Sequence, residues 1–424
     1  ESEGFAICGA FTPGHAGTEW CERRLLARIH RYTIRSLREQ IEPVASADFM
    51  RFLLEWQGLT TRPRPQGAAS LERVLEQLEG FELPAIAWEA DVLPSRLQDY
   101  DGAWLDSLCL SGRMFWARLQ PPARATAAPV RATPMALLTR RNRAWWQQPG
   151  TSGPDAASLS AAAQSIAQYL QRHGASFFDQ IVTGAGLLRT QVESALGELV
   201  AAGVVSADSF GGLRALLLPL PRRRALRGHR GGSFGLDEAG RWSLVHETAA
   251  ASRDASPDSG ARAARDTIEA FAWLLLRRYG VVFRRLLTRE PDWCPAWHEL
   301  LRAYRRLEAQ GLIRGGRFVA GMSGEQYALP DAIGTLRSVR ARAPDGALIA
   351  LSAADPLNLA GIVTPGARLT ALAGNRVLLQ DGVAIASLQA GEVQFHQQLP
   401  AHRQWQARSA LVRKAARSRL ARAG

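Results

Sequence analysis

Apolar residues recur at helical spacing in the last third of the chain, and arginines fill the positions between them. The apolar positions follow an i, i+3, i+4, i+7 spacing and comprise Trp297, Leu300, Leu301, Tyr304 and Leu307. This spacing predicts an amphipathic helix that buries one stripe. Five arginines lie off the stripe or flank the Gly-Gly turn after it, namely Arg302, Arg305, Arg306, Arg314 and Arg317. Their guanidiniums suit phosphate contact, because each planar fork can bind two oxygens.

The same order of elements occurs twice, in segments 172–219 and 277–330. In each copy a helical run is followed by a short second helix, expected over 177–182 or 282–288. A third helix then ends at Gly203 or Gly311, where glycine supplies a left-handed C-cap. Two strands joined by glycines are expected to close each copy. Three helices followed by a β-hairpin predict a winged helix, which is a variant of the helix-turn-helix.

The third helix of the earlier copy is less basic than that of the later copy. Its predicted buried stripe is Val192, Leu196 and Leu199, which leaves three polar residues near solvent: Arg189, Gln191 and Glu193. Arg189 and Gln191 are therefore candidate nucleic-acid contacts. The alternative for both copies is an ordinary solvated helix face in a spacer or protein-contact module.

The N-terminal third of the chain is also expected to be largely helical. Segment 18–43 predicts a basic amphipathic helix that stops near Pro43, and its candidate nucleic-acid contacts are Arg24, Arg28 and Arg31. After a Pro-rich link, helices are expected over 69–79, 85–93 and 102–109, followed by extended segments over 112–119 and 134–146. This order predicts a third winged helix.

The pattern changes after residue 343, where short apolar runs replace the helical periodicity. Asp381-Gly382 between two alternating runs predicts a β-hairpin. We therefore expect a small β-barrel-like module with a basic C-terminal helix. The predicted fold is mainly α with small β-hairpins, in tandem winged helices followed by this module. The predicted regions are 1–60 (basic, helical or winged-helix), 61–150 and 151–220 (winged helices), 221–260 (linker), 261–343 (winged helix) and 344–424 (β-module).

Breaker-rich segments join these regions. Segment 147–157 is one such join, and the linker at 221–260 carries a basic run from Arg222 to Arg230. That run is either an arm that touches a nucleic-acid strand or a solvated linker.

The charge balance favours a polyanionic partner. Lys plus Arg total 52 against 39 acids, which gives a formal charge of +13 and a pI near 10.7. Lys414 is the only lysine, so the basic charge is almost wholly arginine; GC-rich codons and selection for phosphate recognition both explain that skew. A Walker A loop needs a lysine after a glycine-rich turn, and Lys414 has no such loop, so this sequence excludes nucleoside triphosphate binding of that kind.

The four cysteines lie far apart and form no C-x-x-C motif. Zinc is not expected, although Cys8, His15 and Cys21 come near one another in sequence. Sparse cysteines are typical of a reducing cytoplasm. Neither a signal-like leader nor a run of 18 apolar residues occurs, so we expect a soluble cytoplasmic protein with no membrane contact. Because the chain opens with "ESEGF" instead of methionine, we expect it to be part of a longer protein.

Several long blocks carry a family resemblance. They include "EWCERRLLARIHRYTIRSLREQIEP", "QLEGFELPAIAWEADVLPSR", "WLDSLCLSGRMFW", "ADPLNLAGIV" and "GNRVLLQDG". The chain resembles, over almost its entire length, the C-terminal region of Lhr, the large helicase-related proteins of bacteria. The resemblance implies a DNA-repair protein whose remaining portion is a superfamily 2 helicase that moves 3′ to 5′ on single-stranded DNA. ATP and magnesium would belong to that motor, with no cofactor in this region.

The resemblance also implies a possible glycosylase. This part of Lhr is similar to AlkZ-type winged-helix DNA glycosylases, and uracil-DNA glycosylase activity is associated with the family. Such an enzyme needs a carboxylate or amide near an extruded base. Asp355 with Asn358 is the candidate pair, and an Asx turn before Pro356 is the structural alternative. With no Asp or Glu after Glu392, the tail offers no catalytic acid.

Three functional hypotheses follow. In the first, the chain is a DNA-binding appendage that guides a strand, single-stranded DNA or an RNA:DNA hybrid, for the helicase core of the same protein. In the second, it is a monofunctional glycosylase that removes uracil or an alkylated base. In the third, it is an oligomerisation scaffold that uses winged helices for contacts between copies.

Overall fold

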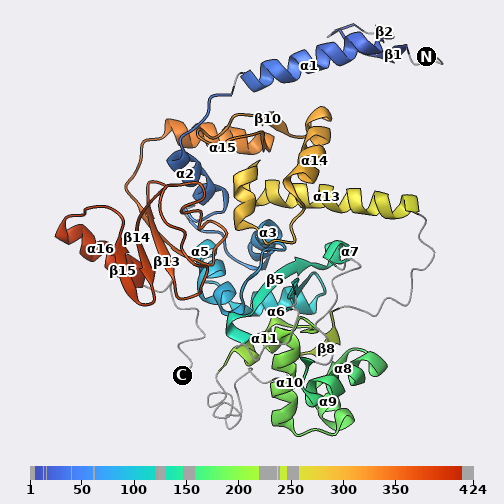
Figure 1. Cartoon of the computed structure of the whole chain (residues 1–424), viewed down its shortest axis with the longest axis vertical. Helices are drawn as coiled ribbons and strands as arrows, with labels where there is room; N and C mark the ends of the chain where they lie inside the picture. The colour runs from blue at the N-terminus through green and yellow to red at the C-terminus, as the bar shows by residue number, and fades with distance from the viewer. Residues whose placement is uncertain are drawn as a thin grey trace.

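The computed structural model describes residues 5–12, 14–15, 17–39, 41–60, 63–120, 122, 130–146, 158–218, 236, 239–245 and 257–412. Their buried apolar side chains form two large cores and a small third one. One large core unites the last winged helix with residues 44–59 and part of the C-terminal module, and the other joins the first and middle winged helices. Figure 1 shows how these elements are arranged. No described helix combines the length and apolarity needed to cross a membrane.

The last winged helix has the predicted order of elements. They are α13 (Pro257–Tyr279), β9 (Val281–Phe283), a 3-10 helix (Arg284–Arg289), α14 (Trp297–Ala309), β10 (Arg314–Gly316), β11 (Gln326–Ala328) and α15 (Pro330–Ala341). The three strands pair antiparallel in the order β10-β11-β9. Leu300, Tyr304 and Leu307 are fully buried, so the predicted apolar stripe is confirmed. The expected short second helix is instead a strand followed by the 3-10 turn.

The middle winged helix departs from the prediction at its wing. Its elements are α8 (Ala161–His173), β6 (Ser176–Phe177), α9 (Phe178–Ala185), α10 (Arg189–Ala201), β7 (Val205–Ala207), α11 (Phe210–Leu217) and β8 (Arg241–Leu244). The prediction of a glycine-linked hairpin over 204–219 was wrong, because the second half of that segment forms helix α11. The strand that pairs with both β6 and β7 is β8, which lies in the segment expected to be a linker.

Tertiary packing explains why α11 forms despite two glycines. Phe210 and Leu213 are fully buried, and burial of such side chains outweighs the cost of about 1 kcal/mol per helical glycine. Gly212 also lies against the buried Trp242 of β8, where an added Cβ would come within 2.9 Å of Ala239. The basic run Arg222 to Arg230 and the join at 147–157 lie outside the described residues.

The first winged helix follows the predicted order. It comprises α3 (Ala68–Leu78), β3 (Leu83–Pro84), α4 (Ala85–Ala87), a π-helical turn (Trp88–Val92), α5 (Leu93–Arg96), α6 (Gly102–Leu110), β4 (Met114–Ala117) and β5 (Pro134–Thr139). Its strands pair in the order β3-β5-β4. The preceding helix α2 (Ser46–Trp56) contributes to the other large core, beneath the last winged helix.

The C-terminal module is an open sheet. Strands β12 (Leu348–Ser352), β13 (Arg376–Gln380), β14 (Val383–Gln389) and β15 (Glu392–Phe395) form an antiparallel meander, and α16 (Ala401–Val412) follows. In the described residues β12 and β15 do not pair, so the predicted barrel-like closure is not found. Both faces of the open sheet are covered without barrel closure. Val377 and Leu379 pack on the large core, and Leu378 packs with α16 on the other face.

The predicted hairpin at Asp381-Gly382 is confirmed. The two residues join β13 to β14 with φ values of 50° and 79°, which is the positive-φ pair that a type I′ turn requires. An added Cβ on Gly382 would lie 2.0 Å from the carbonyl oxygen of Ala47, so only glycine fits.

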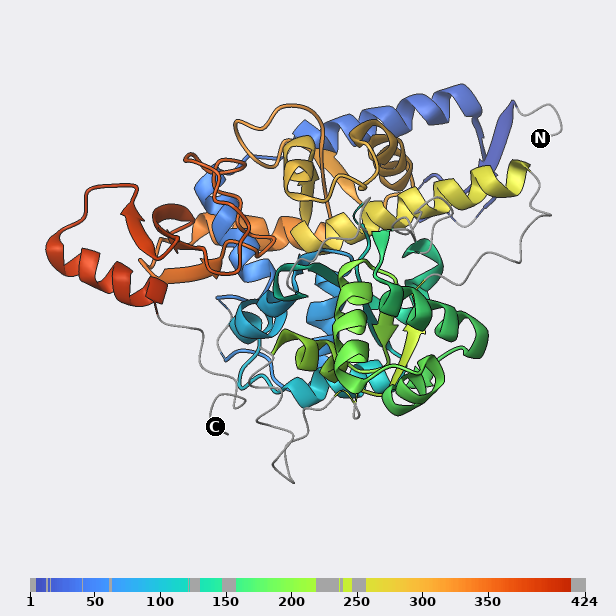
Figure 2. The same cartoon turned by 60° about the horizontal axis from the view of Figure 1, so that its bottom comes forward.

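The N-terminal elements extend away from the rest of the molecule. They are β1 (Ala6–Gly9), β2 (Glu19–Glu22) and α1 (Arg23–Glu39), the basic helix that the sequence predicted. Figure 2 shows α1 and α16 at opposite ends of the protein. Leu25, Ile29 and Tyr32 on α1 are 39%, 49% and 75% exposed, so the described residues leave much of its apolar face uncovered.

Candidate nucleic-acid interface

Helix α14 presents its arginines to solvent. Burial of Leu300, Tyr304 and Leu307 fixes the orientation of the helix, and the carboxylate of Glu299 caps its start by accepting the N–H of Ala296 at 3.0 Å. The three predicted contact residues on α14 are all exposed: Arg302, Arg305 and Arg306. The helix therefore carries a basic outer face, as predicted.

Arg305 joins α14 to the wing. Its Nη2 lies 2.6 Å from Oε1 of Glu325, a residue just before β11. The hydrogen bond to Glu325 raises the pKa of Arg305, and the same bond lowers the pKa of Glu325. The Arg305 side chain is still 57% exposed, and an exposed pair of this kind contributes at most about 1 kcal/mol. A phosphate could therefore compete for Arg305 at small cost.

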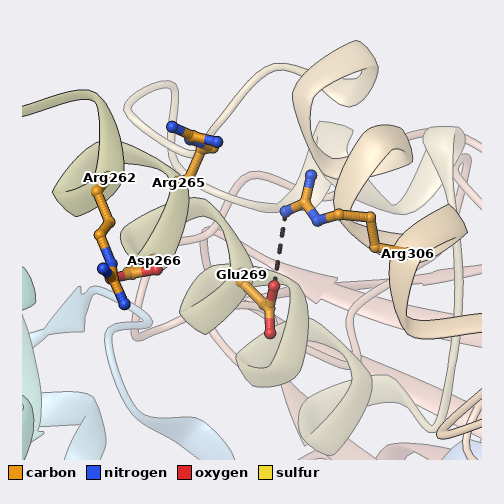
Figure 3. A pocket seen from close by; sticks show the side chains of 5 residues that line it. All are labelled: Arg262, Arg265, Asp266, Glu269 and Arg306. Atoms are coloured by element: carbon orange, nitrogen blue, oxygen red, sulfur yellow. Dashed lines mark ion pairs between the residues drawn. The ribbon is translucent and has the colours of Figure 1, made fainter. Parts of the chain in front are cut away.

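Arg306 faces a cavity of ≈470 Å³ between α14 and the N-terminal half of α13 (Figure 3). The cavity is lined by Arg262, Arg265, Asp266, Glu269 and Arg306. Arg306 Nη2 lies 3.5 Å from Oε2 of Glu269. Three guanidiniums against two carboxylates leave this rim basic. The sequence prediction missed Arg262 and Arg265, although their i, i+3 spacing places them on one side of a helix.

The remaining predicted arginines of this winged helix are Arg302 on α14, Arg314 in β10 and Arg317 just after β10. All three are exposed. Within the described part of the chain, none of their guanidiniums has an ion-pair partner. Their charges are therefore available to an external anion.

Helix α1 is fixed beside this surface at its C-terminal end. Both carboxylate oxygens of Glu308 on α14 accept from Arg38, at 2.9 Å from Nε and 2.5 Å from Nη2, and this hydrogen bonding raises the pKa of Arg38. Glu308 also accepts the N–H of Gly315 at 3.0 Å. An added Cβ on Gly315 would lie 2.6 Å from that carboxylate, so the Gly-Gly turn permits the close approach.

The other predicted contacts on α1 are Arg24, Arg28 and Arg31, and all three are exposed. They lie in the N-terminal half of α1, away from the end that Arg38 fixes to α14. The Nε of Arg31 donates to the carbonyl of Ala27 at 3.3 Å, a contact within the same helix. Helix α1 therefore continues the arginine surface of the last winged helix.

The third helix of the middle winged helix, α10, offers fewer accessible arginines than α14. Arg189 is exposed but pairs with Asp179 and lies over the ring of Phe178, 4.9 Å from its centroid. The side chain of Gln191 is exposed, and its Oε1 accepts the N–H of Leu188 as a helix cap. Glu193, expected near solvent, is only 5% exposed, so that prediction was wrong.

The third helix of the first winged helix, α6, is partly covered. Asp106 on α6 accepts the N–H of Gly211 at 2.7 Å and pairs with Arg214 at 2.9 Å, both from α11. Arg214 also pairs with Glu89 at 2.8 Å. The middle winged helix therefore occupies part of the outer face of α6, at Asp106, while Ala103, Ser107 and Leu110 stay exposed.

Asp355 and Asn358 lie inside the protein, 1% and 5% exposed. Arg96, which is fully buried, donates to both oxygens of Asp355, at 2.7 and 3.0 Å. Oδ1 of Asp355 also accepts the N–H of Leu357 at 2.9 Å, which is the Asx turn of the structural alternative. A catalytic role for the two residues stays a prediction, and these contacts support the structural role.

Two cysteine thiols are poor candidates for a reacting group. Burial raises the pKa of both Cys109 and Cys294 to about 12, so these thiols stay protonated at neutral pH and are poor nucleophiles. No group of three or more His, Cys, Asp or Glu side chains in the part of the chain that the structure describes is arranged to hold a metal ion.

Comparison with known proteins assigns the family. Two family models described as "Large helicase-related protein, winged-helix domain" match residues 261–348 and 44–139. The chain is 30% identical to the "Lhr helicase/ probable uracil glycosylase" of Mycolicibacterium smegmatis over 92% of its own length. The chain belongs to the Lhr family. It is also 30% identical to the "Lhr helicase/uracil glycosylase" of Escherichia coli over 82% of its length.

The chain spans about a quarter of these Lhr relatives, 26% and 24% of their lengths, and corresponds to their C-terminal part. The two matched segments contain the first and last winged helices. The exposed arginines of α14 thus lie within an Lhr winged-helix domain. The predicted resemblance to Lhr is confirmed.

Proposed function

We propose that this Lhr chain binds DNA through α14 and the wing formed by β10 and β11, and holds a strand for the helicase core of the same protein. The observation that carries the proposal is the exposed arginine set on one helix and its wing, with Arg302, Arg314 and Arg317 unpaired within the described residues. Winged helices commonly present this helix and wing to nucleic acid. The formal charge of +13 adds a long-range attraction for phosphates.

The neighbouring elements extend this surface. Arg262 and Arg265 of α13 lie on one side of α14, and the arginines of α1 continue it beyond Arg38. Arginines from several helices that contact one DNA backbone give affinity without sequence specificity, because phosphates carry no direct sequence information. We expect single-stranded DNA and an RNA:DNA hybrid both to bind. ATP and magnesium would act in the helicase core, outside this region.

The test is a salt titration of DNA binding to the full chain. Single-stranded DNA should bind with a log K that falls linearly against log salt, at a slope of about −4 for six phosphates. Arg302→Glu, Arg305→Glu and Arg306→Glu combined should weaken binding roughly 100-fold and make the slope shallower by about two, because each lost phosphate contact removes about 0.7. Fluorescence anisotropy with labelled oligonucleotides measures both quantities.

A charge-matched variant separates local contact from net charge. Arg337, Arg368 and Arg403 are exposed and lie away from α14, on α15, a loop and α16. Reversing these three charges gives the same net charge as the α14 variant. Equal losses in the two triple variants would contradict the proposal, as would an α14 variant that binds like the wild type.

A second candidate function is base excision, favoured by the words "uracil glycosylase" in the names of both relatives. A base-excision assay on uracil-containing DNA, with alkali cleavage of abasic sites, tests it directly. We expect Asp355→Asn to lose activity only in proportion to its loss of folded protein, because Asp355 is paired and buried. An active-site role would instead abolish cleavage in a variant that stays folded.

A further inference from the structure

A groove of ≈460 Å³ lies between the first and middle winged helices, apart from α14. One wall comes from β4 and the segment after β5, with Phe115, Arg140 and Arg143. The opposite wall comes from the middle winged helix and includes Arg241 and Ser243 of β8. The volume lies within the range of small-molecule sites, about 300 to 1,000 Å³.

The groove is basic. Arg140, Arg143 and Arg241 line it, with Asp208 as the acidic side chain in its lining. Asp208 accepts a hydrogen bond only from Nε of Arg241, at 2.9 Å. The two terminal nitrogens of that guanidinium are therefore left for another acceptor. The Arg140 guanidinium has no hydrogen-bond or ion-pair partner in the described ranges and is exposed. An anion would satisfy both groups.

The groove also has an apolar wall. Phe115 is half-buried, and Leu170 and Leu244 line the same space. Ser243 adds a hydroxyl that can donate or accept a hydrogen bond. An aromatic face beside guanidiniums is the combination that holds a nucleotide, because the base stacks while the phosphate binds the cations.

The position of the groove connects it to the proposed DNA surface. In both views α14, the projecting half of α13, α7 (Arg143–Trp146) and β8 lie on the same side of the molecule (Figures 1 and 2). Arg262 and Arg265 lie on α13, on the side that faces α14. A strand that leaves α14 over α13 would reach the groove.

We infer that this groove holds one nucleotide of a single-stranded DNA, with its phosphate on Arg140 and Arg241 and its base against Phe115. The inference rests on the proposed function, because the strand is the one held at α14. It adds a second site on a different pair of winged helices. Single-stranded DNA is the ligand, because a duplex would have to extrude a base to fill a groove of this size.

Photocrosslinking locates the bound base. A single-stranded oligonucleotide carrying 5-bromodeoxyuridine is irradiated with the full chain, and the adducts are mapped by mass spectrometry. We expect adducts in 114–117 or 241–245. Arg140→Glu should reduce them roughly tenfold, because it removes a phosphate contact and adds a negative charge. Ala175→Trp should reduce them by a similar factor, because it fills the groove and excludes the base without a change of charge.

Each result has a separate meaning. Arg403→Glu is the charge control and should leave the groove adducts unchanged. Adducts confined to α14 and its wing would overturn the groove and leave the proposed function intact. If the wild-type chain neither binds the oligonucleotide nor forms any adduct, both the groove site and the proposed DNA-binding function are overturned. Groove adducts that persist in Arg140→Glu and Ala175→Trp would overturn the assigned contacts.

Discussion

Helices α6 and α14 occupy the same place in their winged helices but face different surroundings. The outer side of α6 carries no arginine and is partly covered by α11, whose Arg214 pairs with Asp106. The outer side of α14 is open and carries Arg302, Arg305 and Arg306. The position of the third helix in the fold therefore does not decide whether its outer side is open and basic. The neighbours of that helix and its own outward side chains decide it.

The same contrast holds for arginine itself. Arg96, Arg214 and Arg278 are nearly or fully buried and join elements that are far apart in the sequence. Arg278, for example, pairs with Glu290 and also donates to the carbonyl of Glu79 in the first winged helix. Buried guanidiniums of this kind fix the arrangement of the units, whereas the exposed ones on α14 are left for a ligand.

The largest expected effect comes from breaking a buried pair. Arg96→Met leaves Asp355 without its partner at 1% exposure, which should destabilise the protein by about 3 to 5 kcal/mol. Oε1 of Gln57 would also lose its donor, now 2.6 Å away. The midpoint of urea unfolding measures the loss.

A double variant checks the cause. Arg96→Met with Asp355→Leu removes both charges and should recover much of the stability, because apolar replacement of a buried pair is often neutral. Arg337→Met, at an exposed position, should change little. A single variant as stable as the wild type would mean that Asp355 is not held by Arg96, and would reopen its catalytic candidacy.

Sequence periodicity predicted the elements that depend on local pattern. The stripe of α14, the order of its winged helix and the Asp381-Gly382 turn all follow from spacings of a few residues. The helix α11 and the strand β8 do not, because the first is stabilised by packing on another unit and the second pairs with strands some 35 or more residues earlier in the chain. Pairing at that separation leaves no local signal.

The candidate site also divides into features set by local sequence pattern and features set by contacts between distant segments. Exposure of Arg302, Arg305 and Arg306 was predictable, because it follows from the buried stripe of one helix. The covering of α6 was not, because it depends on Arg214 from a different winged helix. Burial of Asp355 likewise depends on Arg96, 259 residues away in the sequence.

A smaller loss of stability is expected when the contact between α11 and α6 is removed. Arg214→Ala removes the partner of both Glu89 and Asp106, whose side chains are 13% and 24% exposed, so the cost should be about 2 kcal/mol, below that of Arg96. Hydrogen exchange should rise in α6 and α11. DNA affinity should stay unchanged, because α6 carries no arginine. A several-fold gain in affinity would show that the cover hides a second DNA-binding face.

The smallest expected effect on stability comes from changing Glu325, the acid that pairs with Arg305 on α14. Glu325→Gln should change stability by less than about 1 kcal/mol, because the pair is exposed, and should raise DNA affinity about two- to fivefold by removing a negative charge near the phosphate path. Fluorescence anisotropy at neutral pH measures the gain. Glu299→Gln, at the start of the same helix, is a control for loss of an acid at a distance from the wing.

The pH dependence of that gain sharpens the test. Arg305 lowers the pKa of Glu325, so the carboxylate stays charged even somewhat below its ordinary pKa and becomes neutral only as the pH falls through the lower folded value. The affinity difference between wild type and Glu325→Gln should therefore persist at neutral pH and shrink in acid, where wild-type Glu325 also loses its charge. A difference that stays constant down to that pH would mean that the carboxylate acts through the shape of the wing and not through its charge.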